Sequence, residues 1–401
     1  LTALLALALL SGAAPAAPAA AEDWSMDDPP KAAPTGALAG TERDLTVVER
    51  VPLGVVVCVI PFNFPVELTV EKAAAALAAG NVVILKPPPQ NPLAAVGTAS
   101  IMVDAGLPAG VLQIVAGGGE VSAALCAADG VDAVSLTGSV AAGVAVARST
   151  AAALRPLHLE LGGNGAVIVL NDADLEHVTS EVLRGRLLMN GQACAATKRI
   201  IAVRPVADEL TDRLRAALAA VAVGDPMLES SEVGPLIDAA SATRVASQVD
   251  RIVADGGKLV GDATGSDGAW FPPALLTSVP ATAEVAADDE IFGPVFPVIP
   301  VADAAEAVTV ANGSELALTA AVFSADVARA FAVAERIDVG GVVINGTNNY
   351  RPPVVPFGGV GMAGSGREGI GYTYEEMTRT RFIALRNLRP ARISLGEVAG
   401  G

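Results

Sequence analysis

Residues 54–86 read GVVVCVIPFNFPVELTVEKAAAALAAGNVVILK, and this stretch decides the class of fold. Two apolar runs rich in β-branched residues, 54–60 and 81–86, flank a segment at 65–80 that is rich in helix formers and ends on Gly80, a favourable helix stop. Strand, helix and strand in this order predict a βαβ unit with two parallel strands. Continuous apolar strands of this kind are buried on both faces of their sheet.

The same alternation continues on both sides of residue 162, so we predict an α/β fold with two domains joined near that residue. Before the junction, the pattern predicts strands at 111–115, 133–138 and 156–161 and helices at 92–105, 120–128 and 140–149. After it, the pattern predicts strands at 165–170, 198–203, 320–325 and 341–346 and helices at 173–189, 205–221 and 327–337. A last apolar segment, TRTRFIALRN (378–387), is typical of an edge strand that pairs in an oligomer.

The composition excludes several classes of function. A net charge of −17 disfavours binding to nucleic acid, which requires basic surface. After residue 22 no uninterrupted apolar run is long enough to span a membrane. The three cysteines are far apart and form no disulfide framework, which indicates a reducing, cytoplasmic setting. The two histidines, His158 and His177, lack ligands at metal-binding spacing, so we predict no metal site.

The first residues, LTALLALALL followed by SGAAPAAPAAAED, resemble the apolar core and cleavage end of a secretory signal. They contain no initiating Met and no basic residue before the core, so we favour an Ala-rich leader or a fragment boundary. We expect residues 1–43 to be poorly ordered because they are rich in Ala, Pro and Gly.

The candidates for chemistry stand in loops that follow predicted strands, where functional groups collect on a rigid scaffold. Cys58 and Cys126 lie in apolar runs and are expected to be buried, whereas Cys194 lies in the polar segment NGQACAATKR (190–199). Together the loops supply a thiol nucleophile, a carboxylate base, an amide donor and a helix N-terminus, the set needed for covalent chemistry at a carbonyl. The loop candidates are Asn63, Lys86, Gly138, Ser139, Glu160, Cys194 and Glu290.

From about residue 48 to 388 the chain resembles the NAD(P)-dependent aldehyde dehydrogenases. The resemblance rests on PFNFP, NVVILKP, LTGSVAAG, LELGGN, GQACAA, DDEIFGPV and PFGGVGMAGSGREG, which occur in the family's order and spacing. It implies a modified Rossmann-type parallel-sheet cofactor domain, an α/β catalytic domain and a small oligomerisation strand region. The corresponding ranges are 1–43 for the leader, 44–162 for the cofactor domain, 163–371 for the catalytic domain and 372–401 for the oligomerisation strand and tail.

The resemblance also implies the roles of the catalytic residues. Cys194 would attack the aldehyde carbon, and the amide of Asn63 and the backbone N–H of Cys194 would hold the oxyanion. Glu160 would activate the water that hydrolyses the thioester. Lys72 matches a lysine with a proposed role in proton relay. The resemblance places Phe64, Arg351 and Phe357 near the aldehyde, with Arg351 as a receptor for an anionic tail; the alternative for Arg351 is a surface loop residue.

The implied cofactor is NAD or NADP. The pyrophosphate would lie at Gly138 and Ser139, at a helix N-terminus. Lys86 would contact the adenosine ribose, Glu290 the nicotinamide ribose, and Phe292 the nicotinamide ring. The remaining cofactor contacts that the resemblance implies are Ile60, Pro61, Phe62, Pro89, Leu161 and Gly162.

The sequence departs from the family pattern at three places. Pro89 replaces an acidic residue that many NAD-preferring members have, which leaves NADP open. Ala193 precedes the nucleophile where enzymes that recognise phosphorylated glyceraldehyde have arginine. We also expect helices and a strand pair that precede PFNFP in the family to be missing, because the leader stands in their place.

We therefore expect an enzyme that oxidises an aldehyde to a carboxylic acid and forms a homodimer or homotetramer. Two alternatives remain open. One is a non-catalytic relic that binds a nucleotide or a partner. The other is a CoA-acylating semialdehyde dehydrogenase, against which Glu160 argues.

Overall fold

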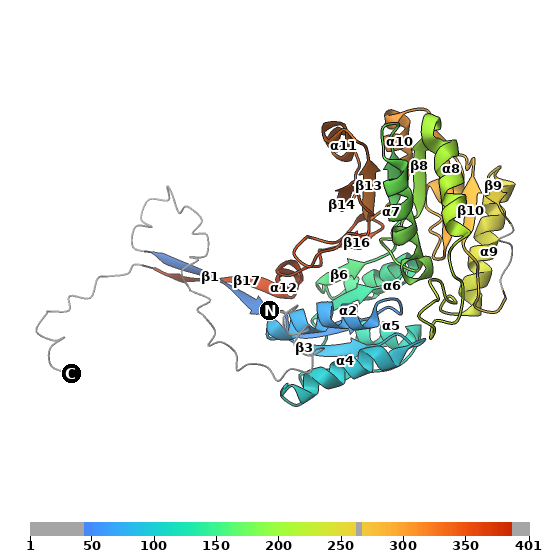
Figure 1. The fold of residues 1–401 in the computed structure, drawn as a ribbon. Coiled ribbons are helices and arrows are strands. Elements are labelled where there is room, and N and C mark those ends of the chain that lie inside the picture. The colour runs from blue at the N-terminus through green and yellow to red at the C-terminus, as the bar shows by residue number, and fades with distance from the viewer. Residues whose placement is uncertain (1–43, 262–266, 387–401) are drawn as a thin grey trace, which may run out of the picture.

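The computed structural model describes residues 44–261 and 267–386, which form two open sheets with flanking helices and a two-stranded arm (Figure 1). The predicted leader (1–43) and the C-terminal tail beyond residue 386 lie outside the described residues. The predicted α/β class is confirmed.

The first sheet has six strands in the order β16-β6-β5-β2-β3-β4, and its β2 pairs in parallel with both β3 and β5. The predicted βαβ unit is therefore correct. Val56, Val57 and Cys58 of β2 have no exposed surface, as the continuous apolar run predicts. The strands are β2 (Val55–Val59), β3 (Val82–Lys86), β4 (Leu112–Ile114), β5 (Ala133–Thr137), β6 (Leu157–Glu160) and β16 (Gly364–Ser365).

The helix predicted at 65–80 contains a π-helical turn that the sequence pattern does not show. The turn, η1 (Val70–Ala74), separates α2 (Pro65–Thr69) from α3 (Ala75–Ala78). Such turns are frequent at functional sites, and this one carries Lys72, whose side chain is fully buried. The other helices of this part are α4 (Pro92–Asp104), α5 (Gly119–Ala127) and α6 (Val140–Ala151).

The second sheet has seven strands in the order β14-β13-β7-β8-β11-β10-β9, and it carries the largest hydrophobic core. All its neighbours pair in parallel except β9, which is antiparallel to β10. Its strands are β7 (Ala166–Val169), β8 (Arg199–Val203), β9 (Lys258–Val260), β10 (Ala274–Thr277), β11 (Val295–Val301), β13 (Thr319–Phe323) and β14 (Gly341–Ile344). Its helices are α7 (Leu175–Leu187), α8 (Arg204–Leu218), α9 (Ala239–Ala254), α10 (Ala304–Ala311) and α11 (Val327–Ala334).

Short elements complete the described chain. The strand β16 returns to the first sheet and pairs antiparallel with β6, so the segment after β14 contacts both sheets. These elements are η2 (Leu188–Gly191), η3 (Glu284–Ala286), β12 (Leu316–Ala317), β15 (Val360–Gly361) and α12 (Tyr372–Glu376).

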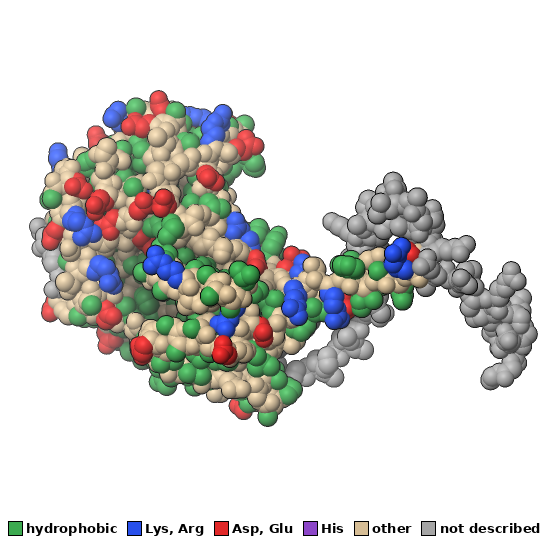
Figure 2. Space-filling view, turned by 180° about the vertical axis from the view of Figure 1, so that it is seen from behind, with side chains coloured by type: hydrophobic (Ala, Val, Ile, Leu, Met, Phe, Trp, Pro, Cys, Tyr) green, Lys and Arg blue, Asp and Glu red, His purple; other side chains and the backbone are tan. Residues whose placement is uncertain are grey.

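The arm is an antiparallel pair of β1 (Leu45–Pro52) and β17 (Thr378–Leu385), in register from Leu45 opposite Leu385 to Pro52 opposite Thr378. Figure 2 shows it standing clear of the body, with hydrophobic and basic side chains along it. The sequence analysis did not predict β1, and the absence of helices and a strand pair ahead of PFNFP stays a prediction. The predicted edge strand at 378–387 is correct, but its partner within the described residues is β1 of the same chain.

Candidate active site

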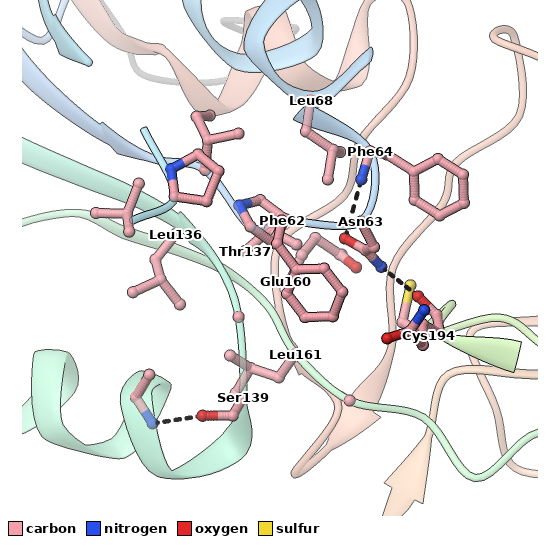
Figure 3. Close-up of a pocket in the computed structure, with 18 of the residues that line it drawn as sticks. Phe62, Asn63, Phe64, Leu68, Leu136, Thr137, Ser139, Glu160, Leu161 and Cys194 are labelled. Carbon is pink, nitrogen blue, oxygen red and sulfur yellow. Dashed lines mark hydrogen bonds between the residues drawn. The ribbon is translucent and has the colours of Figure 1, made fainter. Parts of the chain in front are cut away.

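One large pocket, with a volume of about 1020 Å³, lies between the two sheets. Loops that follow β2, β3, β5 and β6 of the first sheet form one wall, and the loop before β8 and the segment around residue 290 form the other. Every residue that the sequence analysis placed in the site lines this pocket except Lys72. Figure 3 shows Asn63, Glu160 and Cys194 converging at one end and Ser139 at the start of a helix at the other.

The loop that carries Cys194 turns sharply just before the thiol. Met189, Asn190 and Gly191 have φ values of 52°, 56° and 78°, so three successive residues adopt the left-handed conformation. A Cβ on Gly191 would lie 2.2 Å from the carbonyl oxygen of Gly293, so only glycine fits there. The side chain of Asn190 fixes the turn by donating to Pro235 O at 3.0 Å and accepting from Gly234 N at 3.1 Å.

Cys194 differs from the other two cysteines in its access to the pocket. Cys58 and Cys126 are fully buried in the first sheet and its helices, as predicted, whereas Cys194 is partly exposed and lines the pocket. Burial, followed by the negative charge of Glu160, raises the pKa of the Cys194 thiol to about 12. The thiol is therefore protonated at neutral pH in this state, and it needs a base to become a nucleophile.

Asn63 joins the two walls of the pocket. It follows β2, and its side-chain amide donates to the backbone carbonyl of Gln192, two residues before Cys194, at 2.9 Å. Its side-chain oxygen accepts from Phe64 N at 3.1 Å, which fixes the orientation of the amide group. An amide NH₂ has two N–H groups, so a second donor remains on the Cys194 side of the pocket.

Glu160 is the last residue of β6, and its side chain is buried. Neither carboxylate oxygen has a hydrogen-bond partner among the described residues. Burial, and next the charge of Glu368, raise its pKa well above the usual value for a glutamate. The loop after Glu160 lies against the nucleophile, since a Cβ on Gly163 would be 2.9 Å from the backbone oxygen of Cys194.

Behind Glu160 and Cys194 lies a buried ionic network. The sequence analysis anticipated its members Lys72 and Arg351 but not Glu368. Lys72 Nζ donates to Glu368 Oε1 at 2.8 Å and to Ser135 Oγ at 3.0 Å. Arg351 Nη2 donates to the other Glu368 oxygen at 2.6 Å. Burial alone raises the pKa of Glu368, but Lys72 and Arg351 outweigh it and hold the pKa at about 2.

Glu368 is a site residue that the sequence analysis missed. It belongs to the GREG end of the segment PFGGVGMAGSGREG, so the motif contained the signal, but nothing in the local sequence shows that it meets Lys72, which is 296 positions earlier. The sequence analysis also missed Lys198, which is buried and immediately precedes the buried strand β8.

Arg351 is already paired with two carboxylates in this structure. Besides Glu368, its guanidinium lies 3.4 Å from Glu67 Oε1, and its plane covers the Phe357 ring with 4.1 Å between Cζ and the ring centroid. Phe64, Leu68 and Phe357 give the same end of the pocket an apolar wall.

The other end of the pocket has the features that a dinucleotide requires. Ser139 is the N-cap of α6 and accepts from Ala142 N at 3.3 Å, and Gly138 precedes it. The N-terminus of a helix favours an anion such as a pyrophosphate. Lys86 ends β3 and its Nζ donates to Gly117 O at 3.4 Å, and burial is the main cause that lowers its pKa. Pro88, Pro89 and Gln90 line the wall next to it.

Glu290 and Phe292 lie between the two ends. Glu290 Oε1 accepts from Lys198 Nζ at 2.8 Å and from Gly163 N at 3.2 Å. The rings of Phe292 and Phe62 pack edge to face, with centroids 6.2 Å apart. The two residues therefore contact the opposite wall, Glu290 at Gly163 and Phe292 at Phe62.

Comparison with known proteins agrees with this geometry. Residues 17–383 match the model of the aldehyde dehydrogenase family. The vanillin dehydrogenase of an Amycolatopsis species is 38% identical over 92% of this chain and 74% of its own. The NADP-dependent glyceraldehyde-3-phosphate dehydrogenase from Bacillus halodurans, solved in complex with NADP, is 36% identical with a TM-score of 0.83, over 87% of this chain and 73% of that chain. The NAD-dependent aldehyde dehydrogenase from Sinorhizobium meliloti is 33% identical with a TM-score of 0.82, over 87% and 70%.

The chain belongs to the aldehyde dehydrogenase family, whose members oxidise aldehydes to carboxylic acids with NAD(P)⁺. The predicted family, fold and reaction are thus confirmed. Across residues 44–261 and 267–386, no helix has the length and apolar character needed to cross a membrane.

Proposed function

We propose that Cys194 is the nucleophile and Glu160 the base in an NAD(P)⁺-dependent oxidation of an aldehyde to an acid. The observation that carries this proposal is the convergence of Asn63, Glu160 and Cys194, from loops of two different sheets, on one pocket. The structural alternative, an inert buried cysteine, describes Cys58 and Cys126 but not Cys194, which is open to the pocket.

In the first step the Cys194 sulfur bonds to the carbonyl carbon, and the thiol proton passes to the Glu160 carboxylate. Neither carboxylate oxygen of Glu160 has a hydrogen-bond partner among the described residues, and its pKa is raised. Glu160 is therefore a stronger base than an ordinary glutamate. The carbonyl oxygen becomes an oxyanion, which the second N–H of the Asn63 amide stabilises. One such donor contributes about 3–4 kcal/mol to the transition state in other oxyanion holes.

The pocket fits a nicotinamide dinucleotide, because an anion-binding helix N-terminus, a lysine and a carboxylate all line it. Gly138 and Ser139 would hold the pyrophosphate, Lys86 the adenosine ribose, and Glu290 with Phe292 the nicotinamide end. A nicotinamide bound there would supply the hydride acceptor for the oxidation. Ile60, Pro61, Phe62, Leu161 and Gly162 complete this wall.

After oxidation Cys194 carries a thioester, and Glu160 removes a proton from the water that attacks it. The C–S bond then breaks, the acid leaves, and the thiolate is restored. Glu160 must therefore release two protons in each turnover: the thiol proton before it can activate water, and the water proton before the next cycle. We propose that Lys72, whose charge acts on Glu160 and whose Nζ donates to Ser135 and Glu368, takes part in their release.

Two further properties belong to the proposal. Pro88, Pro89 and Gln90 line the wall beside Lys86 and carry no carboxylate, although the charge of Glu120 acts on Lys86, and we propose that NADP⁺ is accepted as well as NAD⁺. The exposed apolar residues of the arm, with Phe382 71% exposed, support a homodimer or homotetramer in which the arm is covered. Comparing kcat/KM for the two nucleotides and measuring the mass in solution test these statements. A cytoplasmic location stays a prediction of the sequence.

The decisive test is NAD(P)H formation with a panel of aldehydes by the parent chain and by Cys194→Ala. We expect no turnover in that variant, while Cys58→Ala and Cys126→Ala, taken as matched controls, keep theirs. Turnover that survives Cys194→Ala would eliminate the mechanism. A folded parent chain that binds nucleotide but oxidises no aldehyde would instead favour the non-catalytic alternative, and thioester transfer to CoA faster than to water would favour the CoA-acylating one.

A further inference from the structure

Two buried cations stand behind the pocket wall that carries Glu290 and Phe292. The side chains of Lys198 and Arg186 are fully buried, with relative exposures of 1% and 0%. Lys198 Nζ contacts three consecutive residues: Glu290 Oε1 at 2.8 Å, Ile291 O at 3.3 Å, and the Phe292 ring, whose centroid is 4.3 Å away. The side chain of Lys198 thus contacts residues 290–292 from the side that faces away from the pocket.

Arg186 adds a second hold on the same segment, since its Nη2 donates to Ile291 O at 3.1 Å. Its Nε and Nη1 have no hydrogen-bond partner among the described residues. Glu290 is the carboxylate paired with this group, so two cations share one counter-charge in a buried place. Burying excess charge is unfavourable, and such an arrangement persists where it serves the position of a functional group.

We propose that Lys198 is a positioning residue for the nicotinamide end of the dinucleotide, acting through Glu290 and Phe292. The inference rests on the proposed function, in which Glu290 meets the nicotinamide ribose and Phe292 the ring. The carboxylate of Glu290 has two oxygens, and Lys198 and Gly163 N both bind Oε1. Oε2 lies beside Gly162, another lining residue, since a Cβ there would be 2.2 Å from it, and we infer that Oε2 is the oxygen that meets a ribose hydroxyl.

Lys198 has a second effect on the site, because its charge is felt at the nucleophile. It lowers the pKa of the Cys194 thiol, whereas Glu160 and Glu290 raise it. Loss of Lys198 therefore slows alkylation of Cys194 at a fixed pH. A residue with a purely structural role would change stability without changing this rate.

The test measures dinucleotide binding without aldehyde, by titration of NAD⁺ and NADP⁺, in Lys198→Met, Glu290→Gln and the double variant. If Lys198 acts through Glu290, each single variant binds about 10-fold more weakly or worse, which corresponds to one charge-assisted hydrogen bond. The dinucleotide affinity of the double variant then equals that of whichever single variant binds the dinucleotide more weakly. The exposed Lys258→Met on β9 is the matched control and keeps the parent affinity.

Lys198→Gln keeps a hydrogen-bond donor without the charge. It replaces Lys198→Met in the same dinucleotide titration if Lys198→Met does not fold. We expect intermediate affinity and an alkylation rate of Cys194 below that of the parent chain. Parent-like dinucleotide affinity in either folded variant, or additive losses in the double variant, would overturn the inference. Failure of the parent chain itself to bind dinucleotide would instead refute the proposed function.

Discussion

The side-chain amide of Asn63 donates a 2.9 Å hydrogen bond to the backbone carbonyl of Gln192 and so links the two sheets across the pocket. Asn63 follows β2 of the first sheet, and Gln192 lies two residues before Cys194 in the loop that leads to β8 of the second. The bond fixes the distance between the proposed oxyanion donor and the proposed nucleophile. The relative position of the two sheets therefore enters the chemistry directly.

Replacing Asn63 with Ala removes this link and the oxyanion donor together. We expect kcat to fall by about 10²–10³-fold, the loss observed for one oxyanion donor elsewhere. Steady-state kinetics with a good aldehyde measures the effect. Asn312→Ala, which removes a surface amide that donates to Arg336 O, is the control. A kcat within a few-fold of the parent value would remove Asn63 from the mechanism.

Glu368→Gln should move the pH dependence of thioester hydrolysis. Glu160 must be deprotonated to act as a base, so the rate rises with pH through its raised pKa. The pKa of Glu160 is raised by burial and next by the charge of Glu368. Glu368→Gln removes the second cause and leaves Lys72 and Arg351 without their carboxylate. The rising limb of the kcat profile therefore shifts to lower pH. The partly exposed Glu376→Gln serves as control, and an unmoved or alkaline-shifted limb contradicts the expectation.

Glu67→Gln should change the selectivity for the charge of the aldehyde. Arg351 is paired with Glu368 and Glu67, so the parent chain offers an anionic tail no free cation. With Glu67 neutral, Arg351 gains an open side, and kcat/KM for an aldehyde with a carboxylate tail rises about 5-fold relative to a neutral aldehyde. This factor corresponds to about 1 kcal/mol, the upper value for an exposed ion pair. An unchanged ratio would mean that aldehydes do not approach Arg351.

His158 should make the fold sensitive to acid. Burial, followed by the charge of Lys72, lowers its pKa from 6.5 to about 3, while Ser135 Oγ lies 2.9 Å from its Nδ1. Between these pH values the unfolded chain binds more protons, so the free energy of unfolding decreases as pH falls from 6.5 toward 3, by at most about 1.4 kcal/mol per pH unit. Urea unfolding across this range measures the slope. His158→Asn should flatten it relative to the parent and to His177→Asn at the exposed histidine, and an equally steep slope would refute the assignment.

The sequence predicted the first sheet well because its strands are short continuous apolar runs separated by clear helix stops. It predicted less between residues 222 and 319. There β11 lies in the middle of the second sheet, yet it contains Pro297 and Pro300, which argue against a central strand. The partner β1 was missed because its exposed, alternating surface lacks the buried run that marked the other strands.

The candidate site shows the same division. Asn63, Glu160 and Cys194 stand at strand ends or in Gly-marked loops, so local sequence identified them. Glu368 and Lys198 act through residues distant along the chain, and only the folded structure brings Glu368 to Lys72 and Lys198 to Glu290.

The most direct test of the central claim is mass spectrometry of the Glu160→Gln variant, quenched in acid after mixing with an aldehyde and NAD(P)⁺. This variant slows both the deprotonation of Cys194 and the hydrolysis of the thioester, so the account predicts slow formation of no more than one equivalent of NAD(P)H and an acyl group attached to the peptide that contains Cys194. Formation of NAD(P)H without an adduct, or an adduct on the peptides of Cys58 or Cys126, would contradict it.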